Sequence, residues 1–532
     1  MHSSTKSNLL VASCYAGILA LGMAVGPKFG RESKLIQSGN FLSGGTEKVE
    51  QVLNIIKENY VDPVKVDTLQ HLAINQILSH LDPHSSYLPP VKAREQSQSL
   101  EGNYYGIGVE YTILNDTMLV TSVKSGPAEQ AGIEAGDKII KIDQRNVAGS
   151  KTPSQKIGSL IKGRAGTTVK LLVKKRDNQR EELVVVKRDK ITVSSIDAAY
   201  MLTPGIAYVK ISKFGARTDE DFAAELSHLQ KNNLKSLILD LRHNGGGYLN
   251  AATALADEFL PDNQLIVYTQ GEHEPRTDYF ATKKGRFEQG NLVVLIDETS
   301  ASASEIVAGA LQDVGRGTLI GRRSFGKGLV QEQFNFGDGS ALNLTIARYY
   351  TPLGRSIQRP YKMNPGEYFE EASKRLEHSE VNADGTTKDS LFDKKHSYTT
   401  SSGRVLYGGG GIMPDIYIPI DTSAFNSFFY TLRARGILTE FLFSQVVKTV
   451  RPTSLKQVVS EFNLTDSQYK HLVEVAIKSG VKTTEKTAGI AREAVTNELK
   501  ALLARVYFGE EAYYKVLNLN DKAIARSLQE LK

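Results

Sequence analysis

The sequence predicts a multidomain α+β protein: an α/β core on a mainly parallel sheet, an inserted β-rich domain, and helical regions at both ends. Three observations predict it. Strands and helices alternate between residues 191 and 421, as in a parallel sheet covered on both faces. Several short strand patterns crowd into residues 101–190, and beyond Thr422 apolar residues recur with a helical period. A length of 532 residues leaves room for about three domains.

Composition excludes several classes of function. Hydrophobic residues make up 40% and charged residues 23%, which is typical of a globular protein. The net charge of +6 is mild for this length, and no basic block is interleaved with aromatics, so we expect no nucleic-acid partner. Cys14 is the only cysteine, which rules out an intrachain disulfide. No His or Cys spacing predicts a metal site, and we expect no cofactor.

Residues 1–26 carry the pattern of a targeting segment. Lys6 precedes a mostly apolar run, Leu9–Val25, which is near the lower limit for spanning a bilayer. We therefore expect an N-terminal signal or an uncleaved anchor in the inner membrane, with the body of the protein in the periplasm or outside. A polar linker, 27–45, follows.

Residues 46–100 are predicted to be an N-terminal helical region. Two amphipathic helices are expected there, over Thr46–Tyr60 and Asp67–Leu81. The β-rich module then has two short helices, Ala128–Ala131 and Ser154–Lys162. Its expected strands are Ile107–Ile113, Leu119–Val123, Lys138–Ile142 and Val169–Val173.

The α/β core is predicted over residues 191–421. Strand Leu237–Leu241 runs into a glycine turn, Arg242–Gly247, that leads to helix Leu249–Leu260. Glycines at such a turn let the backbone approach a ligand closely. Residues 361–404 are polar and without clear period, so they are expected to be a surface insertion. Residues 422–532 are predicted to be a helical C-terminal domain.

A small serine-rich turn joins strand Val293–Ile296 to a helix, and Ser302 lies at that junction. Free N–H groups at a helix start stabilise a developing oxyanion. Lys327 and Gln331 are expected on one strand face, because side chains alternate with period two. If burial lowers the pKa of a lysine to about 7–8, its neutral amine can deprotonate a serine hydroxyl. On residue types alone, a helix-capping Ser302 and a surface Lys327 explain the pattern as well.

The motifs SASASEIVAGALQD and SFGKGLVQ resemble the signature of the C-terminal processing (tail-specific) serine peptidases. The resemblance implies a nucleophile at Ser302, a general base at Lys327 and a positioning partner at Gln331. It also implies an oxyanion hole formed by the N–H of Ala303 and the N–H of a glycine in the turn after Leu241. We expect that glycine to be Gly247, and Gly246 is the second choice. Ser304 is then the expected helix cap.

The segment SGPAEQAGIEAGDKIIKID resembles the PDZ signature. Gly106, Ile107, Gly108 and Val109 stand where PDZ domains carry their carboxylate-binding loop. Free N–H groups in such a loop bind a terminal carboxylate, and an adjacent strand edge pairs with the incoming tail. The partners implied are therefore proteins or peptides with free C-termini.

Parts of the sequence also fit two other kinds of site. A nucleotide-binding loop at Gly321–Lys327 is rejected because Gly328 stands where serine or threonine is required. A triad of Ser302 with His243 and Asp240 is disfavoured because those two lie in one turn. His84 is expected to be a turn residue.

The sequence thus predicts a serine endopeptidase of the cell envelope that recognises protein C-termini and cleaves near them. The alternative is a non-enzymatic PDZ adaptor or a chaperone-like binder of protein tails. The helical C-terminal domain is expected to pack on the core, to dock a partner or to mediate self-association, which leaves a homo-oligomer possible.

Overall fold

The computed structural model describes residues 47–282, 284–361, 365–375, 380–382, 388, 392, 396–420 and 422–532. The chain divides into two compact units, Met1–Gln76 and Ile77–Lys532. The predicted anchor, 1–26, and linker, 27–45, lie outside the described residues, so both stay predictions. Within the described ranges, no helix combines the length and the apolar character needed to cross a bilayer.

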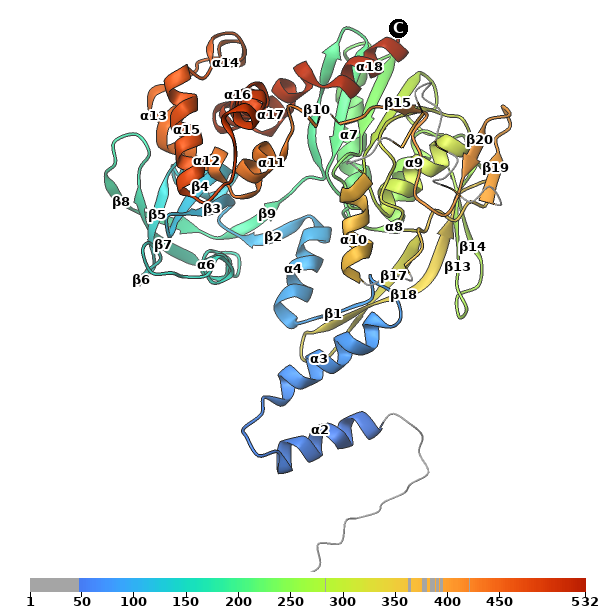
Figure 1. Ribbon diagram of the computed structural model, residues 1–532, viewed down its shortest axis with the longest axis horizontal. Helices are drawn as coiled ribbons and strands as arrows, with labels where there is room; N and C mark the ends of the chain where they lie inside the picture. Colours follow the sequence, from blue (N-terminus) through green and yellow to red (C-terminus); the bar gives the residue numbers. More distant parts are fainter. Residues whose placement is uncertain are drawn as a thin grey trace, which may run out of the picture. The chain divides into compact units, whose positions relative to one another are not determined.

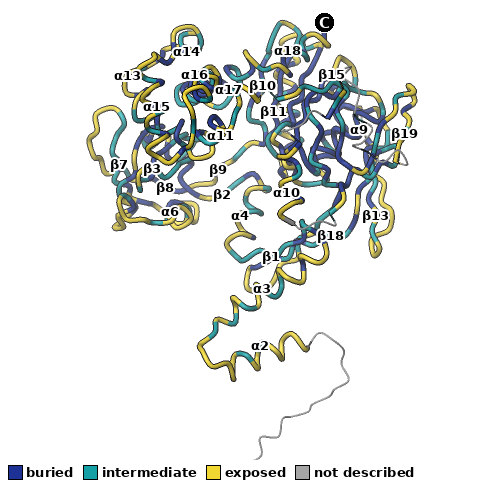
Figure 2. Tube along the Cα trace, viewed as in Figure 1, coloured by how far each residue is buried: buried dark blue, intermediate teal, exposed yellow. Residues whose placement is uncertain are grey.

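The two predicted N-terminal helices are confirmed within two residues at their ends. They are α2 (Glu47–Asn59) and α3 (Val66–Ser79), and most of the residues of α2 are exposed (Figures 1 and 2). A third helix, α4 (Pro90–Glu101), follows a short strand and was not predicted. It ends at Gly102, whose φ of 67° is the left-handed conformation that glycine adopts readily.

The second unit is built on a six-stranded sheet ordered β10-β11-β12-β15-β16-β21. All neighbours in this sheet are parallel except β10 and β11, so the predicted mainly parallel sheet is confirmed. The strands are β10 (Ile196–Thr203), β11 (Ile206–Ile211), β12 (Ser236–Asp240), β15 (Asn291–Ile296), β16 (Thr318–Gly321) and β21 (Ile416–Tyr417).

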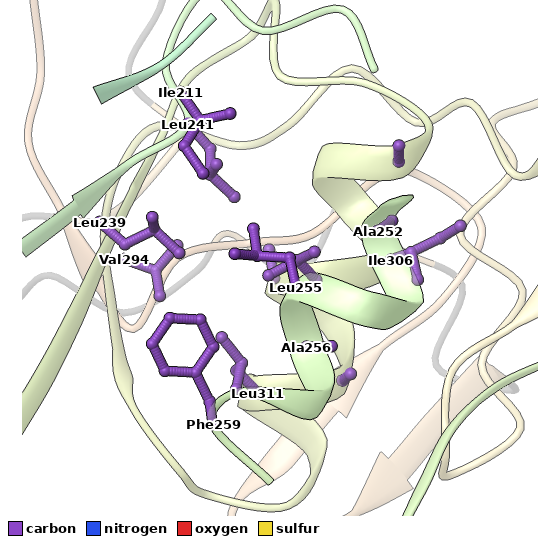
Figure 3. Close-up of a cluster of buried hydrophobic side chains, with 14 of the residues drawn as sticks. Ile211, Leu239, Leu241, Ala252, Leu255, Ala256, Phe259, Val294, Ile306 and Leu311 are labelled. Atoms are coloured by element: carbon purple, nitrogen blue, oxygen red, sulfur yellow. The ribbon is translucent and has the colours of Figure 1, made fainter. Parts of the chain in front are cut away.

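Alternation along each strand divides the apolar residues between two cores. Leu237 and Leu239 face one side, and Ile238 between them faces the other. The first side is covered by α7 (Thr218–Gln230), α8 (Leu249–Asp257) and α9 (Ala303–Asp313). Figure 3 shows side chains of α8 and α9, such as Leu255 and Leu311, directed towards Leu239 and Val294 of the strands. The other side is covered by α17 (Glu510–Leu517) and α18 (Lys522–Glu530).

A second, antiparallel sheet was not predicted. Its path is β1-β18-β13-β14, and β17 also pairs with β18. Its strands are β1 (Ser86–Leu88), β13 (Leu265–Gln270), β14 (Thr277–Phe280), β17 (Leu329–Asn335) and β18 (Ala341–Tyr350). Its members come from distant parts of the chain, so only tertiary pairing brings them together. β1 thereby places the residues just before it beside β17 and β18.

The β-rich module has the predicted strands and two more. Its sheet runs β3-β4-β5-β7-β8, with β6 paired to β5, and β3 is an edge strand. The elements are β3 (Val109–Leu114), β4 (Thr117–Val123), α5 (Pro127–Gln130), β5 (Lys138–Ile142), β6 (Arg145–Asn146), α6 (Ser154–Ile161), β7 (Thr168–Lys174) and β8 (Glu181–Lys187). Strands β2 (Asn103–Gly106) and β9 (Asp189–Thr192) pair where the chain enters and leaves it.

The C-terminal region is helical, as predicted, and packs on both neighbours. The helices before α17 are α11 (Ser427–Ala434), α12 (Ile437–Phe441), η4 (Leu442–Val446), α13 (Val447–Thr449), α14 (Leu455–Glu461), α15 (Asp466–Lys478) and α16 (Glu485–Phe508). Arg505 of α16 lies 3.0 Å from Glu110 on β3 of the β-rich module. Asp521, before α18, lies 2.7 Å from Arg242 in the core.

Candidate active site

Ser302 lies between β15 and α9. The turn that carries it is stabilised by hydrogen bonds among the side chains and N–H groups of the turn itself. Oδ1 of Asp297 accepts hydrogen bonds from the N–H and hydroxyl of Thr299 and from the N–H of Ser300. Ser302 itself has φ 54° and ψ −114°, a strained conformation for a residue with a Cβ. A backbone conformation as strained as this persists only where many surrounding contacts fix it. It presents Ser302 at the start of α9, where backbone donors are free.

Glu305 is the group that fixes this strained residue. Its carboxylate is fully buried and accepts from the N–H of Ser302 at 2.8 Å and from the N–H of Lys327 at 2.9 Å. It also accepts from the N–H of Gly326 and the hydroxyl of Ser324. Burial raises the pKa of Glu305, and the four donors oppose that rise. One carboxylate therefore joins the backbones of the predicted nucleophile and the predicted base.

Lys327 is held by Gln331, the contact that the sequence predicted, although Lys327 lies two residues before β17 and not in the strand as expected. Nζ of Lys327 donates to Oε1 of Gln331 at 2.6 Å, and Nε2 of Gln331 donates to the main-chain oxygen of His84 at 2.7 Å. Burial lowers the pKa of Lys327, while the charges of Asp82 and Glu305 act in the opposite direction. Among the described residues, the amine of Lys327 is hydrogen-bonded to one side chain, the neutral amide of Gln331, so it can lose its proton more readily than a surface lysine.

The glycine turn after β12 packs directly against Ser302. A Cβ on Gly246 would lie 2.8 Å from the Cβ of Ser302, so no other residue fits there. The N–H of Gly246 donates a hydrogen bond to Oδ1 of Asn244. Among the described residues, no acceptor is bound to the N–H of Gly247 or of Ala303. This arrangement favours Gly247 over Gly246 as the partner of Ala303 in an oxyanion hole.

A pocket of about 690 Å³ gathers these residues. Its lining includes Ser302, Ala303, Lys327, Gln331 and residues 245–247. One side of α4 completes the wall, with Gln96, Ser97, Ser99 and Leu100 among its lining residues. The residues predicted for catalysis and for the oxyanion hole, which come from three separate segments, thus share one cavity.

A second pocket, of about 620 Å³, lies in the β-rich module between the edge strand β3 and α6. Ile107, Gly108 and Val109 line it, as predicted, and Gly106 does not. Gly106 ends β2, where a Cβ would meet the ring of Tyr104 at 3.1 Å, so its role is in packing. The other side of α4 lines this groove too, with Val91, Arg94, Glu95 and Gln98.

The histidine and aspartate of the disfavoured triad do not line the pocket of Ser302. His243 is 67% exposed and its Nδ1 lies 3.0 Å from Asp297, outside the lining of the pocket that holds Ser302. Asp240 is bound by Arg242 and by the hydroxyl of Tyr208. The prediction that Ser304 caps α9 is wrong: the N-cap is Ser302, and Ser304 lies inside the helix with its hydroxyl on the carbonyl of Asn244.

Sequence reasoning missed three contributors to the site. Glu305 follows Ser302 by three residues, and this S-x-x-E spacing is a capping-box signal that was available. The hydroxyl of Tyr349 donates to the main-chain oxygens of Ser302 and Lys327. The third is His84, which offers its main-chain oxygen to Gln331. Nothing local marks Tyr349 or that oxygen of His84, because both act across strand pairings.

Comparisons with known proteins identify the families that the chain matches. Residues 205–365 match the model of peptidase family S41, residues 106–186 match the PDZ domain, and residues 428–509 match a family of unknown function, DUF8443. A carboxy-terminal-processing protease of Bartonella bacilliformis is 38% identical over 309 residues, which are 57% of this chain and 70% of that protein.

Two further relatives are similar. The carboxy-terminal processing protease CtpB of Bacillus subtilis is 32% identical over 65% of this chain and 72% of its own length. A solved photosystem II D1 C-terminal processing protease is 27% identical, with a TM-score of 0.33, over 63% of this chain and 97% of that one. The first two relatives share enough sequence over enough of their length to decide the matter: this chain belongs to the carboxy-terminal-processing proteases of peptidase family S41, and it is a serine protease that carries a PDZ domain.

Proposed function

We propose that this serine protease uses Ser302 as its nucleophile and Lys327 as its general base, and that it cleaves proteins near C-termini that its PDZ domain has captured. The observation that carries the proposal is the burial of Lys327 in the pocket of Ser302, with its amine on the neutral amide of Gln331. Burial lowers the pKa of that lysine, so its amine gives up a proton more readily than that of a surface lysine.

In this mechanism the neutral amine of Lys327 takes the hydroxyl proton of Ser302 as the oxygen attacks the scissile carbonyl. The N–H groups of Ala303 and Gly247 stabilise the oxyanion. The resulting ammonium of Lys327 returns the proton to the leaving amine, and an acyl-enzyme on Ser302 remains. Water then attacks the acyl group with the same base, and the carboxylic acid product leaves with Ser302 restored.

Recognition of a free C-terminus is supported by the groove of the PDZ domain. Its edge strand β3 can pair with an added peptide strand, and Ile107 and Gly108 lie at the end where a carboxylate would be bound. The cationic side chains of Arg94, Lys162 and Arg164 also line this groove and attract a negative charge. A captured tail lies along α4, which lines the catalytic pocket as well.

The test combines a serine-reactive fluorophosphonate with mass spectrometry of a tailed model protein. We expect labelling and cleavage by the wild type, neither by Ser302→Ala, and a loss of about 10³-fold or more for Lys327→Met. Ser227→Ala, an exposed serine of α7, is the matched control and is expected to behave as wild type. Labelling that persists in Ser302→Ala would refute the nucleophile.

A second arm tests recognition of the tail. The same substrate with a C-terminal amide in place of the carboxylate is expected to show a KM raised about tenfold, because one charge-assisted contact is lost. Equal KM values for both substrates would contradict capture by the terminal carboxylate. The alternative of a non-catalytic adaptor or tail-binding chaperone predicts binding without fragments from either substrate.

A further inference from the structure

The predicted surface insertion, residues 361–404, carries a helix, α10 (Pro365–Lys374), that the sequence did not predict. One face of α10 is turned inwards: Tyr368 is 1% exposed, Ala372 7% and Arg375, just after the helix, 8%. These residues are spaced i, i+4 and i+7, which places them on one stripe. The stripe packs on the residues around the general base.

The first contact runs from α10 to Gln331. The hydroxyl of Tyr368 lies 2.9 Å from Nε2 of His84, and the main-chain oxygen of His84 accepts from Gln331. Burial, followed by the charge of Lys327, lowers the pKa of His84 to about 4, so its imidazole is neutral at physiological pH. Because Gln358 already donates to the Tyr368 oxygen, the hydroxyl proton is free to donate to that neutral imidazole.

The second contact holds the backbone on both sides of Lys327. Before the lysine, Arg375 donates to the main-chain oxygens of Ser324 at 2.7 Å and Phe325 at 3.3 Å. After it, Oε1 of Gln358 accepts from the N–H of Gly328 at 2.8 Å, and Nε2 of the same amide donates to the Tyr368 hydroxyl at 3.2 Å. The turn that carries the base is thus fastened to α10 at each end.

The third contact shelters this region from water. The rings of Tyr368 and Phe369 pack edge-on against His84, with centroids 5.3 and 5.8 Å away. The guanidinium of Arg359 lies 3.9 Å from the ring centroid of Phe325 and 4.0 Å from that of Tyr368. This layer lies over His84 and Phe325. His84 contacts Gln331 through its main-chain oxygen, and Phe325 precedes Lys327 by two residues in the sequence.

We propose that α10 is a built-in brace of the general base: Tyr368 and Arg375 are positioning residues that hold His84 and the 324–328 turn, and through them fix Gln331 and Lys327 in the pocket that Ser302 also lines. The inference rests on the proposed role of Lys327. It gives the insertion a function in the reaction, although none of its described residues lines the catalytic pocket.

The test is the pH dependence of kcat for Tyr368→Phe, which removes one hydroxyl and keeps the ring. We expect kcat to fall roughly 3–10-fold with KM unchanged, which is the effect of losing one hydrogen bond. The acidic limb of the profile is expected to move to higher pH, because a loosened, wetter Lys327 returns towards its ordinary pKa. The ionisable groups facing Lys327 are Glu305, Asp82 and His84, and Arg359 acts on His84.

Tyr361→Phe is the matched control, since it removes a tyrosine hydroxyl of the same insertion that binds only the exposed Arg348 among the described residues. It is expected to keep the wild-type profile. Arg375→Lys, which retains the charge and loses the fork that reaches two carbonyls, is expected to shift the acidic limb in the same direction as Tyr368→Phe. A purely structural role would scale activity equally at every pH.

The outcomes separate the two proposals. If Tyr368→Phe and Arg375→Lys keep the wild-type limb and kcat while Lys327→Met is inactive, the brace is refuted and the mechanism stands. If Lys327→Met retains wild-type activity, the mechanism fails and the brace falls with it. A loss of activity in Tyr368→Phe that follows only a lowered Tm, with an unmoved limb, also overturns the brace.

Discussion

Nζ of Lys327 lies 2.6 Å from Oε1 of Gln331. The amide carries no charge, so it orients the amine without opposing deprotonation as strongly as a carboxylate would. Its other end is bound to the main-chain oxygen of His84, which fixes which atom of Gln331 faces the lysine. The pair is therefore a sensitive point at which to test the mechanism.

Gln331→Glu is expected to shift the acidic limb of kcat/KM to higher pH. A carboxylate in contact with Lys327 stabilises the ammonium, so the pKa of the lysine rises and less neutral base is present near pH 7. Activity should recover partly as the pH rises, whereas Gln331→Ala should lose activity at all pH values. The measurement is kcat/KM between pH 5 and 10. Gln264→Glu, on the core surface, is the control, and an unmoved limb in Gln331→Glu would contradict the assignment.

Glu305→Gln is expected to destabilise the protein by about 2–4 kcal/mol and to reduce activity. The carboxylate accepts from four donors, and an amide nitrogen in place of one oxygen leaves two of them facing another donor. Chemical denaturation measures the first effect and steady-state kinetics the second. Glu225→Gln on α7 should leave both unchanged. Wild-type stability in Glu305→Gln would show that the four hydrogen bonds contribute little.

His243→Ala is expected to keep kcat/KM within about threefold of the wild type, because the imidazole is exposed and lies outside the pocket of Ser302. Its pairing with Asp297 supports the turn before the nucleophile, so a small fall in Tm is the expected cost. Parallel assays of His243→Ala and Lys327→Met make the comparison. A loss in His243→Ala as large as that in Lys327→Met would revive the serine–histidine alternative.

Asp521→Asn separates two roles of one carboxylate. Oδ1 of Asp521 caps α18 through the N–H groups of Ala523 and Ile524, and Oδ2 binds Arg242 at 2.7 Å. Asparagine retains the cap and loses the ion pair, so we expect a loss of about 1–3 kcal/mol. Asp521→Ala loses both, with about 1 kcal/mol more.

Thermal and urea unfolding measure these differences. Glu530→Gln, which breaks the exposed i,i+4 pair with Arg526, is the control and should cost at most about 0.5 kcal/mol. If Asp521→Asn and Glu530→Gln cost the same, the contact between the C-terminal helices and Arg242 does not stabilise the core.

Much of the local structure followed from sequence patterns. The strand Val293–Ile296, the helix after Ser302 and the strand after Gly328 are predictable because side-chain periodicity and turn residues act over a few positions. The pairing of Lys327 with Gln331 followed from the same logic, since both were placed on one strand face. The helical character of the region beyond Thr422 followed from the period of its apolar residues.

The sequence by itself predicted which residues would carry the chemistry of this protein: a serine at a helix start, a lysine and a glutamine four residues apart, and a glycine turn. The tertiary structure alone decided what surrounds them. His84, Tyr349 and Tyr368 reach the site through β1, β18 and α10, and no short-range pattern encodes such contacts between segments hundreds of residues apart. The lowered pKa of Lys327 has the same origin, because burial is a property of the packed fold.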